Sequence, residues 1–258
     1  MKIVVLVKDV PDTYGDRKLN METGLADRTA SESVLDEIGE RSLEVALTYA
    51  DDHADAEVVV LSMAPESAVA TIRKGLAMGA ASAIQVVDHD LLGADLGLTA
   101  EVLAAALTRI GFDLVITGNI STDGSGGVLP VMLAELLDVP AVTNLTAVEI
   151  SDDLVAGERA SDGATMRLSA PLPAVTSVTE QLPDGRFPTF KSIKLAKKKP
   201  IETLGLGDLG VTADNLETSR SIMIAVSEKP PRQSGVKIVD EGDAGEQLAE
   251  FLIKNRLA

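Results

Sequence analysis

Residues 113–138 read DLVITGNISTDGSGGVLPVMLAELLD, and this stretch decides the fold. Residues 113–118 form an apolar run that is typical of a strand buried on both faces of a sheet. A glycine-rich loop follows, and the apolar pattern of residues 126–138 predicts a helix. Because parallel strands are usually joined by helical crossovers, the order strand, loop and helix predicts one unit of a doubly wound sheet.

The same alternation extends along the chain in both directions. We expect strands at 2–7, 56–63, 82–88 and 140–150, and helices at 35–52, 65–79 and 96–111. Pro65 in a first turn and Gly79 at a helix end fit the usual asymmetry of helix termini. Residues 9–33 show no such pattern and are expected to be irregular. The chain is therefore predicted to be α/β, with a doubly wound, mostly parallel sheet.

The pattern changes after residue 151. The segments DLVAGERASDGATMRLSA (153–170) and PAVTSVTE (173–180) alternate in polarity, which is typical of an antiparallel hairpin appended to such a sheet. Residues 183–232 are rich in proline and predict an extended arm that leaves the domain, before a helical pattern at 243–257. We therefore expect an α/β nucleotide-binding domain with its hairpin at 1–182, and a loop and C-terminal arm at 183–258.

Composition limits the possible functions. The 258 residues are 45% hydrophobic, which is enough for a substantial core. A formal charge of −17 and an aromatic content of 2% disfavour nucleic-acid binding. No apolar run approaches the roughly 20 residues of a membrane helix, and no signal-peptide core precedes Lys8. We expect a cytoplasmic protein without nucleic-acid partners or direct membrane insertion.

Groups for catalysis or metal binding are scarce. The chain has no cysteine, and its two histidines, His53 and His89, lie in acidic polar stretches. No carboxylates are spaced so as to indicate an acid–base pair. The sequence predicts neither a catalytic site nor a metal site, and hence no enzyme activity for the chain alone.

The glycine-rich loop, 118–130, lies where a doubly wound fold presents ligands, between a strand and the N-terminus of a helix. Its glycines allow close approach of an anion to backbone amides, and its hydroxyls add donors: Gly124, Gly126, Gly127, Ser121, Thr122 and Ser125. It matches neither a Walker A loop nor a GxGxxG fingerprint. A phosphate site and a simple glycine-rich turn are both compatible with the loop composition. Residues 6–13 are either an adjacent wall for adenine or ribose, or an ordinary strand exit.

A basic segment follows the predicted domain. Five lysines fall within 191–199, namely Lys191, Lys194, Lys197, Lys198 and Lys199. A solvated basic face is the default interpretation. However, Phe187 and Phe190, two of the four phenylalanines, lie in the same proline-flanked segment. Aromatic residues in such a polar loop favour a contact surface over a core.

Taken in order, these segments resemble the electron transfer flavoprotein β subunit family. The resemblance is carried by VLVKDVPD (5–12), LDEIGERSLEVAL (35–47), TIRKGLAMGA (71–80), the glycine-rich loop with LAELLDVPAVT (133–143), RFPTFKSIKLAKKKPIETLGLGDLGV (186–211) and PPRQSGVKIV (230–239). It implies an adenine nucleotide α-hydrolase-like fold and a larger α subunit that holds most of the FAD. It also implies a structural AMP in this chain's own crevice.

The family's AMP contacts map by resemblance onto Leu6, Asp36, Met63, Asp123, Gly124, Ser125, Gly126, Gly127, Val128 and Leu129. Two positions depart from the common pattern. Asp36 replaces an asparagine found in many members, and Val128 replaces a common glutamine. Both changes reduce side-chain hydrogen bonding, so backbone amides would be the main hydrogen-bond donors to the phosphate.

The resemblance also assigns a role to the basic segment. It implies that residues 189–193 dock flavin dehydrogenases, such as acyl-CoA dehydrogenases, with Phe190 as the apolar anchor. Further docking residues are Thr189, Lys191, Ile193, Lys194 and Lys197. The C-terminal arm is expected to wrap the α subunit. Electrons are expected to pass on to the electron transfer flavoprotein quinone oxidoreductase, which makes the chain part of a carrier in fatty acid oxidation.

Three alternatives stay open at this point. An electron-bifurcating relative would hold a second FAD in the crevice instead of AMP. An adenine-nucleotide hydrolase or ligase, or a stand-alone nucleotide sensor of the universal-stress type, would share the topology. The arm argues against both self-sufficient proteins, because an arm without a partner would not keep its shape.

Overall fold

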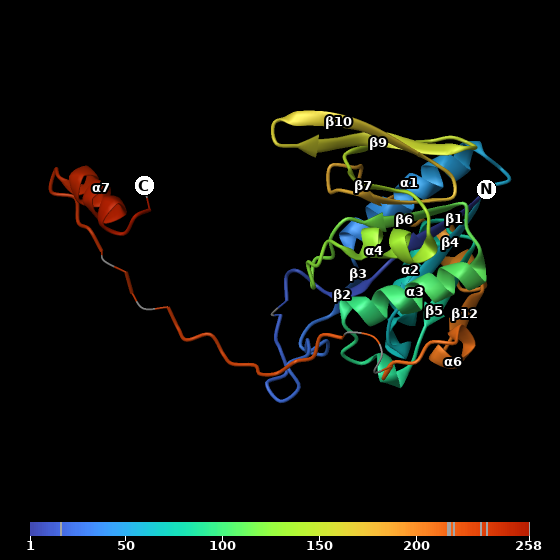
Figure 1. Cartoon of the computed structure of the whole chain (residues 1–258), viewed down its shortest axis with the longest axis horizontal. Helices are drawn as coiled ribbons and strands as arrows, with labels where there is room; N and C mark the ends of the chain where they lie inside the picture. Colours follow the sequence, from blue (N-terminus) through green and yellow to red (C-terminus); the bar gives the residue numbers. More distant parts are fainter. Residues whose placement is uncertain (16, 216–217, 219, 233, 236, 258) are drawn as a thin grey trace. The chain divides into compact units, whose positions relative to one another are not determined.

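The computed structural model describes residues 1–258 apart from 16, 216–217, 219, 233, 236 and 258. The chain divides into two compact units, Met1–Ile224 and Ala225–Ala258. The first unit contains all three described sheets and all but one of the described helices (Figure 1). Each unit is described by itself.

A seven-stranded sheet forms the centre of the first unit, in the order β12-β5-β4-β1-β6-β11-β7. Every pairing within it is parallel. The strands are β1 (Lys2–Leu6), β4 (Glu57–Met63), β5 (Ser82–Val86), β6 (Leu114–Gly118), β7 (Ala141–Leu145), β11 (Ala174–Val178) and β12 (Ile201–Leu204). This confirms the predicted mostly parallel sheet.

Helices cover both faces of the sheet, as predicted for a doubly wound fold (Figure 1). One core contains α1 (Glu37–Asp52) and α2 (Val69–Met78) with Ile3 and Val5 of β1. The opposite core contains Val4 and Leu6 of the same strand. Its helices are α3 (Leu96–Ile110), α4 (Leu129–Leu137) and the short α6 (Leu206–Leu209). Two single 3-10 turns, η1 (Glu66–Ala68) and η2 (His89–Leu91), complete this part.

The order in which strands are added to the sheet changes sides at β1. It runs from β1 outward through β4 to β5, and then returns to β6 on the other side of β1. The connections that follow β1 and β6 therefore lead to different parts of the molecule. Such a switch point opens a crevice outside the carboxyl ends of the two strands, where doubly wound proteins bind ligands.

The predicted role of residues 173–180 is wrong. We expected an antiparallel hairpin segment, but β11 lies between β6 and β7, parallel to both. All five of its residues are buried. Its hydroxyls bond to β7, because Thr176 donates to the carbonyl of Val142 over 2.7 Å and Ser177 accepts from the amide of Asn144 over 2.9 Å. The buried hydroxyls of this internal strand therefore have hydrogen-bond partners in β7.

The antiparallel hairpin itself is confirmed at β9 (Leu154–Ser161) and β10 (Ala164–Pro171). A third strand, β8 (Ala147–Ile150), joins them in a separate sheet. We expected one strand over 140–150, but the chain breaks between β7 and β8. Asn144, the next-to-last residue of β7, has a φ of 58°, and the pairing of β7 with β11 shifts its register there. The regular strand therefore ends at Leu145, before β8 begins.

A second difference lies in the stretch 9–33. It was expected to be irregular, but β2 (Asp9–Pro11) pairs antiparallel with β3 (Ser33–Leu35). Strands of three residues are too short to show a period of two.

The expected arm over 183–232 also differs from the structure. Helix α5 (Phe190–Ala196) packs on α2, and β12 pairs with β5 at the edge of the main sheet. Among the described residues, the regular elements of this stretch end at α6. The segment lacked a visible pattern because each element is shorter than two periods, so tertiary contacts place it.

The second unit contains α7 (Ala244–Lys254), within the helix predicted at 243–257. None of its residues is buried. No helix in the described part of either unit is both long and apolar enough to cross a membrane.

Candidate functional site

The glycine-rich loop occupies the switch point. It connects the end of β6 at Gly118 to the start of α4 at Leu129, and residues 124–128 are exposed. Within the described residues, the amides of Gly126, Gly127 and Val128 donate to no protein acceptor. The left-handed positions are Ser125, with a φ of 51°, and Gly127, with a φ of 68°. Free amides at the start of a helix can donate hydrogen bonds to an anion and so form an anion-binding site.

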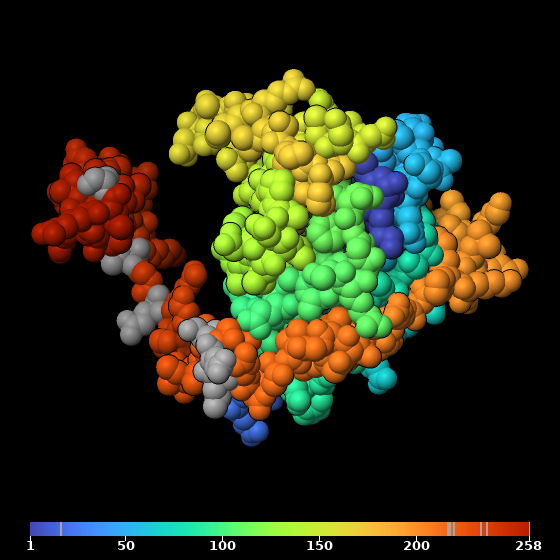
Figure 2. Space-filling view, turned by 45° about the vertical axis from the view of Figure 1, so that its right-hand side comes forward, coloured from blue at the N-terminus to red at the C-terminus, as the bar shows by residue number. Residues whose placement is uncertain are grey.

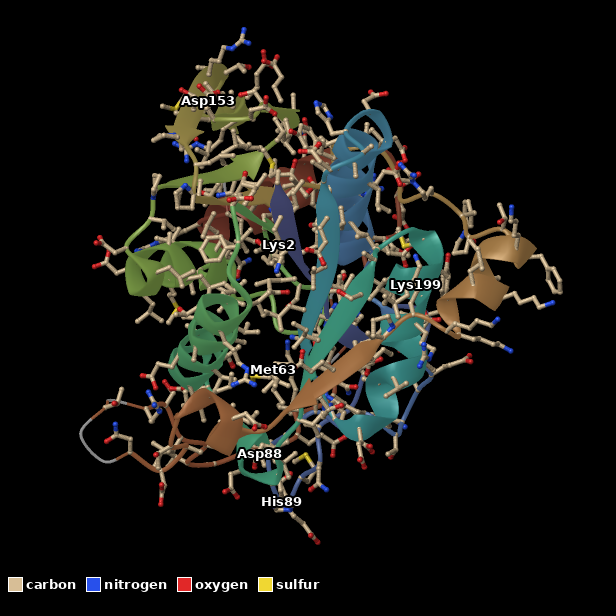
Figure 3. All side chains as sticks on the ribbon, turned by 90° about the vertical axis from the view of Figure 1, so that its right-hand side faces the viewer. Lys2, Met63, Asp88, His89, Asp153 and Lys199 are labelled. Atoms are coloured by element: carbon tan, nitrogen blue, oxygen red, sulfur yellow. The ribbon has the colours of Figure 1, made fainter. Side chains whose placement is uncertain are left out.

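Other predicted contacts lie at the same end of the sheet. Leu6 ends β1, and Met63 ends the neighbouring strand β4. Figure 3 shows Met63 at the end near Asp88, opposite the end marked by Lys2. The topology therefore brings the expected contact residues to one edge, around the carboxyl ends of β1, β4 and β6.

Asp123 lies at the centre of a charged cluster. Its Oδ1 lies 2.7 Å from Lys8 Nζ, and its Oδ2 lies 3.4 Å from Arg28 Nη2. Its side chain is only 12% exposed. Burial alone would raise the pKa of Asp123, but the hydrogen bond and charge of Lys8, together with hydrogen bonds from Ser121 and Gly124, hold that pKa below its ordinary value. Asp123 is therefore an ionised anchor for two cations beside the loop.

A third cation borders the same loop. Arg17 donates to the carbonyls of Thr122 and Pro11, and thus joins the loop after β2 to the glycine-rich loop. Lys8, Arg17 and Arg28 are binding candidates that the sequence reasoning missed. Lys8 was detectable because it lies two residues after the end of β1. The two arginines lie between β2 and β3, where no sequence pattern indicated which way the chain returns.

Asp36 connects α1 to the loop. It is the N-cap residue of α1, yet its side chain does not cap that helix. Instead, its Oδ2 accepts a hydrogen bond of 3.0 Å from the amide of Thr122, while Oδ1 has no partner in the described structure. Burial raises the pKa of Asp36, and the bond from Thr122 offsets this only in part. The buried Oγ1 of Thr122 is also unpaired.

The residues present fit a phosphate. Three free amides, two lysine or arginine side chains at Asp123 and the N-terminus of α4 converge on one loop. A Cβ placed on Gly124 would lie 3.6 Å from Lys8 Nζ, which shows how close the cation is to the loop backbone. An anion here would meet both backbone dipoles and full positive charges.

The predicted docking residues lie on and around α5. Thr189 caps this helix, since its Oγ1 accepts from the amide of Ser192 over 3.2 Å. Phe190 is 86% exposed and Phe187 is 93% exposed. In Figure 2 the orange segment that contains α5 protrudes from the first unit. The expected exposure of Phe190 is therefore observed, along with the exposed side chains of Lys191, Ile193, Lys194 and Lys197.

Charged contacts fix this segment to the domain. Arg186 forms bonds of 2.9 Å from Nε to Glu44 and from Nη2 to Asp51, both on α1. The bonds to Glu44 and then Asp51 raise the pKa of Arg186. After α5, Lys199 Nζ donates to the carbonyls of Leu76, Gly79 and Ala80 at the end of α2. The exposed phenylalanines thus lie between two anchored points.

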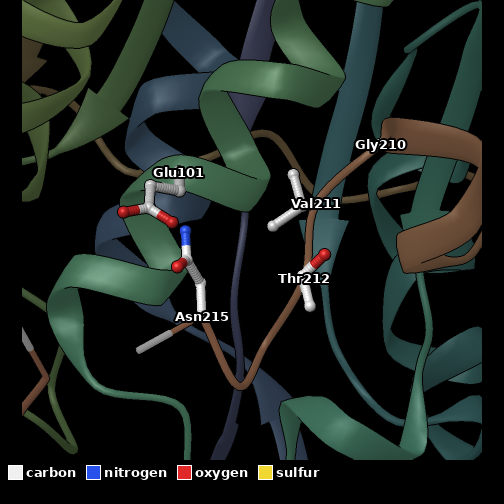
Figure 4. A pocket seen from close by; sticks show the side chains of 5 residues that line it. All are labelled: Glu101, Gly210, Val211, Thr212 and Asn215. Carbon is white, nitrogen blue, oxygen red and sulfur yellow. The ribbon is translucent and has the colours of Figure 1, made fainter. Parts of the chain in front are cut away.

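A separate cavity of about 380 Å³ lies between α3 and the chain that follows α6 (Figure 4). It is lined by Glu101, Gly210, Val211, Thr212 and Asn215. None of the predicted nucleotide contacts lines it. Nor does any group of three or more histidine, aspartate or glutamate side chains within the described residues form a metal site.

The fold and loop define a class: a doubly wound α/β protein with an anion-accepting loop at its switch point. Comparison with known proteins narrows this class. The model of the electron transfer flavoprotein domain matches residues 23–209. The chain is 43% identical to the electron transfer flavoprotein subunit beta of Mycobacterium tuberculosis H37Rv, over 99% of this chain and 98% of the relative.

Two further relatives carry the same name. The protein of Mycobacterium leprae is 42% identical over 99% of this chain and 98% of its own length. That of Bacillus subtilis is 29% identical over 98% of this chain and 96% of its own. The chain belongs to the electron transfer flavoprotein family and is a β subunit, as the sequence motifs indicated.

Proposed function

We propose that this chain is the AMP-binding, client-docking half of a two-subunit electron carrier. A larger α subunit would hold most of the FAD, and flavin dehydrogenases, including acyl-CoA dehydrogenases, would supply the electrons. Electrons would leave towards a quinone oxidoreductase. The chain would not catalyse a reaction by itself, and its location would be the cytoplasm.

One observation carries the nucleotide part of this proposal. The amides of Gly126, Gly127 and Val128 have no protein acceptor in the described part of the chain, and they lie at the switch point. Lys8 and Arg28 contact Asp123 in the same loop. Such a site takes a phosphate group. Leu6 and Met63 end adjacent strands and are suited to contact the rest of the nucleotide.

AMP carries no redox group, so its role would be structural. FAD, when bound, supplies the electron-transfer chemistry. In this chain, the loop would hold the phosphate and thereby join β6, α1 and the β2–β3 connection through Asp36 and Arg17. A ligand that binds only the folded chain stabilises that fold.

The docking part rests on α5. Phe190 is a large apolar side chain held in solvent, and lysines surround it in a chain whose net charge is −17. Apolar anchors with charged surroundings are typical of transient protein interfaces. The proposed client surface therefore has an apolar pocket with an acidic rim.

The loop proposal is tested with two matched glycines. Gly127 and Gly163 have φ values of 68° and 81°. Replacing either with alanine should cost about 1–2 kcal/mol, since left-handed backbone disfavours a Cβ. Only Gly127→Ala should displace the amides, so it should lower the AMP content of the purified complex at least tenfold. Extraction and chromatography of the bound nucleotide measure this.

The purified complex and the chain expressed alone together distinguish the alternative functions. Full AMP content in Gly127→Ala would show that the loop is only a turn. Stoichiometric FAD on the isolated chain would favour the bifurcating type with a second FAD. A colourless monomer with ATPase activity would favour the stand-alone enzyme.

A further inference from the structure

Asp36 is a buried carboxylate at the floor of the proposed nucleotide site. The residue is 1% exposed, and among the described groups its Oδ1 has no hydrogen-bond partner. Among the described residues, the side-chain hydrogen bond of Asp36 that meets geometric criteria comes from the amide of Thr122, at 3.0 Å, and the amide of Ile38 adds a weaker stabilising interaction. A buried carboxylate with one weakly stabilised oxygen is costly to keep ionised.

The nearby cations Lys8 and Arg28 pair with Asp123 and not with Asp36. Lys8 Nζ and Arg28 Nη2 contact Asp123, and Arg17 contacts the carbonyl of Thr122. Helix α1 adds Glu37 and Glu40 in its first turn, of which Glu40 pairs with Lys74 of α2. Asp123 lies one residue beyond the amide that Asp36 accepts from, and its negative charge acts on Asp36. The described residues around Asp36 therefore offer it no ion-pair partner.

A bound phosphate would further destabilise the ionised form of Asp36. The phosphate of a nucleotide monoester carries about −1.5 to −2 charges near pH 7. At residues 126–128 it would lie in the same loop as Thr122, and it would compete with Asp123 for Lys8 and Arg28. Added negative charge close to a buried carboxylate favours the protonated form of that carboxylate.

We propose that Asp36 is a proton-binding site coupled to the nucleotide phosphate, so that the chain takes up a proton at Asp36 when AMP binds. This rests on the proposed function.

The sign of the coupling follows from linkage. Burial already raises the pKa of Asp36 in the free chain, and the phosphate raises it further. Between those two pKa values, binding takes up a proton, and AMP affinity falls as pH rises, by at most about tenfold per pH unit. Outside that interval the contribution of Asp36 is constant.

Asp36→Asn tests the proposal, because the amide keeps the shape and the acceptor for the Thr122 amide. AMP binding to the complex formed by the full chain is measured by calorimetry from pH 5 to pH 8, in two buffers that differ in ionisation enthalpy. The wild type should take up protons near its transition. Asp36→Asn should lose that uptake and bind AMP more tightly at the alkaline end.

Two controls isolate the residue. AMP has its own phosphate titration near pH 6, which affects the wild type and Asp36→Asn equally, so the difference between their slopes reports Asp36. Asp138→Asn removes an exposed carboxylate from the other end of α4 and should keep the wild-type slope. Equal slopes for the wild type and Asp36→Asn would overturn the coupling alone. Failure of the wild type to bind AMP at any pH would reject the proposed function and the coupling with it.

Discussion

Lys197 and Lys199 belong to one basic run but have different surroundings. Lys197 is exposed at the C-cap of α5. Lys199 Nζ contacts three carbonyls at the C-terminus of α2, at 3.0, 3.1 and 2.5 Å. Burial lowers the pKa of Lys199. A cation bound to the last carbonyls of a helix stabilises that helix through its dipole.

We therefore expect the replacement of each lysine by methionine to have a different effect on the free energy of unfolding. Lys199→Met should lower the free energy of unfolding by about 1–3 kcal/mol, because three carbonyls lose a charged donor. Lys197→Met should change it by less than about 0.5 kcal/mol. Denaturant titration of both variants measures this. Equal stabilities would mean that water replaces the ammonium group at α2 without cost.

Individual site residues were predictable only where they lie in ordered motifs. The glycine-rich loop was placed correctly at the end of a strand because strand, loop and helix are contiguous. Lys8 and Arg28 meet Asp123 through contacts over 115 and 95 residues of sequence, which no local pattern shows. The sequence also did not show which loop glycine needs a left-handed backbone. Gly127 has that conformation, whereas Gly126 is constrained by packing, because a Cβ added there would lie 3.3 Å from the side chain of Leu96.

Among the elements, helix α5 combines a rigid attachment with an exposed aromatic residue. Arg186 and Lys199 fix the chain on either side, and Thr189 caps the helix. Phe190 then lies in solvent on a short helix whose position is set before any partner arrives. A preorganised anchor loses little conformational entropy on binding.

Phe190→Ala should weaken client docking by about 2 kcal/mol, or roughly 30-fold in the apparent KM for the carrier. The flavin spectrum and the thermal stability of the complex should not change, since Phe190 packs in no core. Phe187→Ala is the matched control for loss of exposed aromatic area. Charge reversal at Lys194 and Lys197 should instead reduce the salt dependence of the rate. Unfolding or flavin loss in Phe190→Ala, with normal client kinetics, would assign the residue to packing.

Element length explains which parts of the fold were predictable. Helices α1 and α3 have 16 and 15 residues, and their apolar stripes identified them directly. Strand β12 has four residues and α5 has seven, too few for a pattern to appear. Strand β11 was misplaced for another reason: Thr176 and Ser177 suggested an exposed face, but the backbone of β7 satisfies both hydroxyls.

Each of the two units, taken by itself, exposes apolar side chains among its described residues. The first unit ends with Ile222 and Ile224, which are 79% and 91% exposed. In the second unit, α7 presents Leu248 and Phe251, one helical turn apart, and buries neither. An amphipathic helix without a core gains no stability from its apolar side chains in water. Membership of a family of β subunits supports a second chain as the partner for these side chains.

Deletion of residues 225–258 should therefore separate folding from assembly. The remaining unit contains both cores and all sheet pairings, so its free energy of unfolding should change by less than about 0.5 kcal/mol. We expect the apolar face of α7 to contact the α subunit, so affinity for that subunit should fall by about 100-fold or more. Circular dichroism with denaturant measures the first effect, and titration with the isolated α subunit measures the second.

A full-length control with Leu248→Glu and Phe251→Glu keeps the arm but removes the apolar face of α7, and it should reproduce most of the affinity loss. If the double variant binds normally while the deletion does not, the extended residues before α7 form the interface and the helix does not. If the deletion unfolds the first unit, the arm is part of its core.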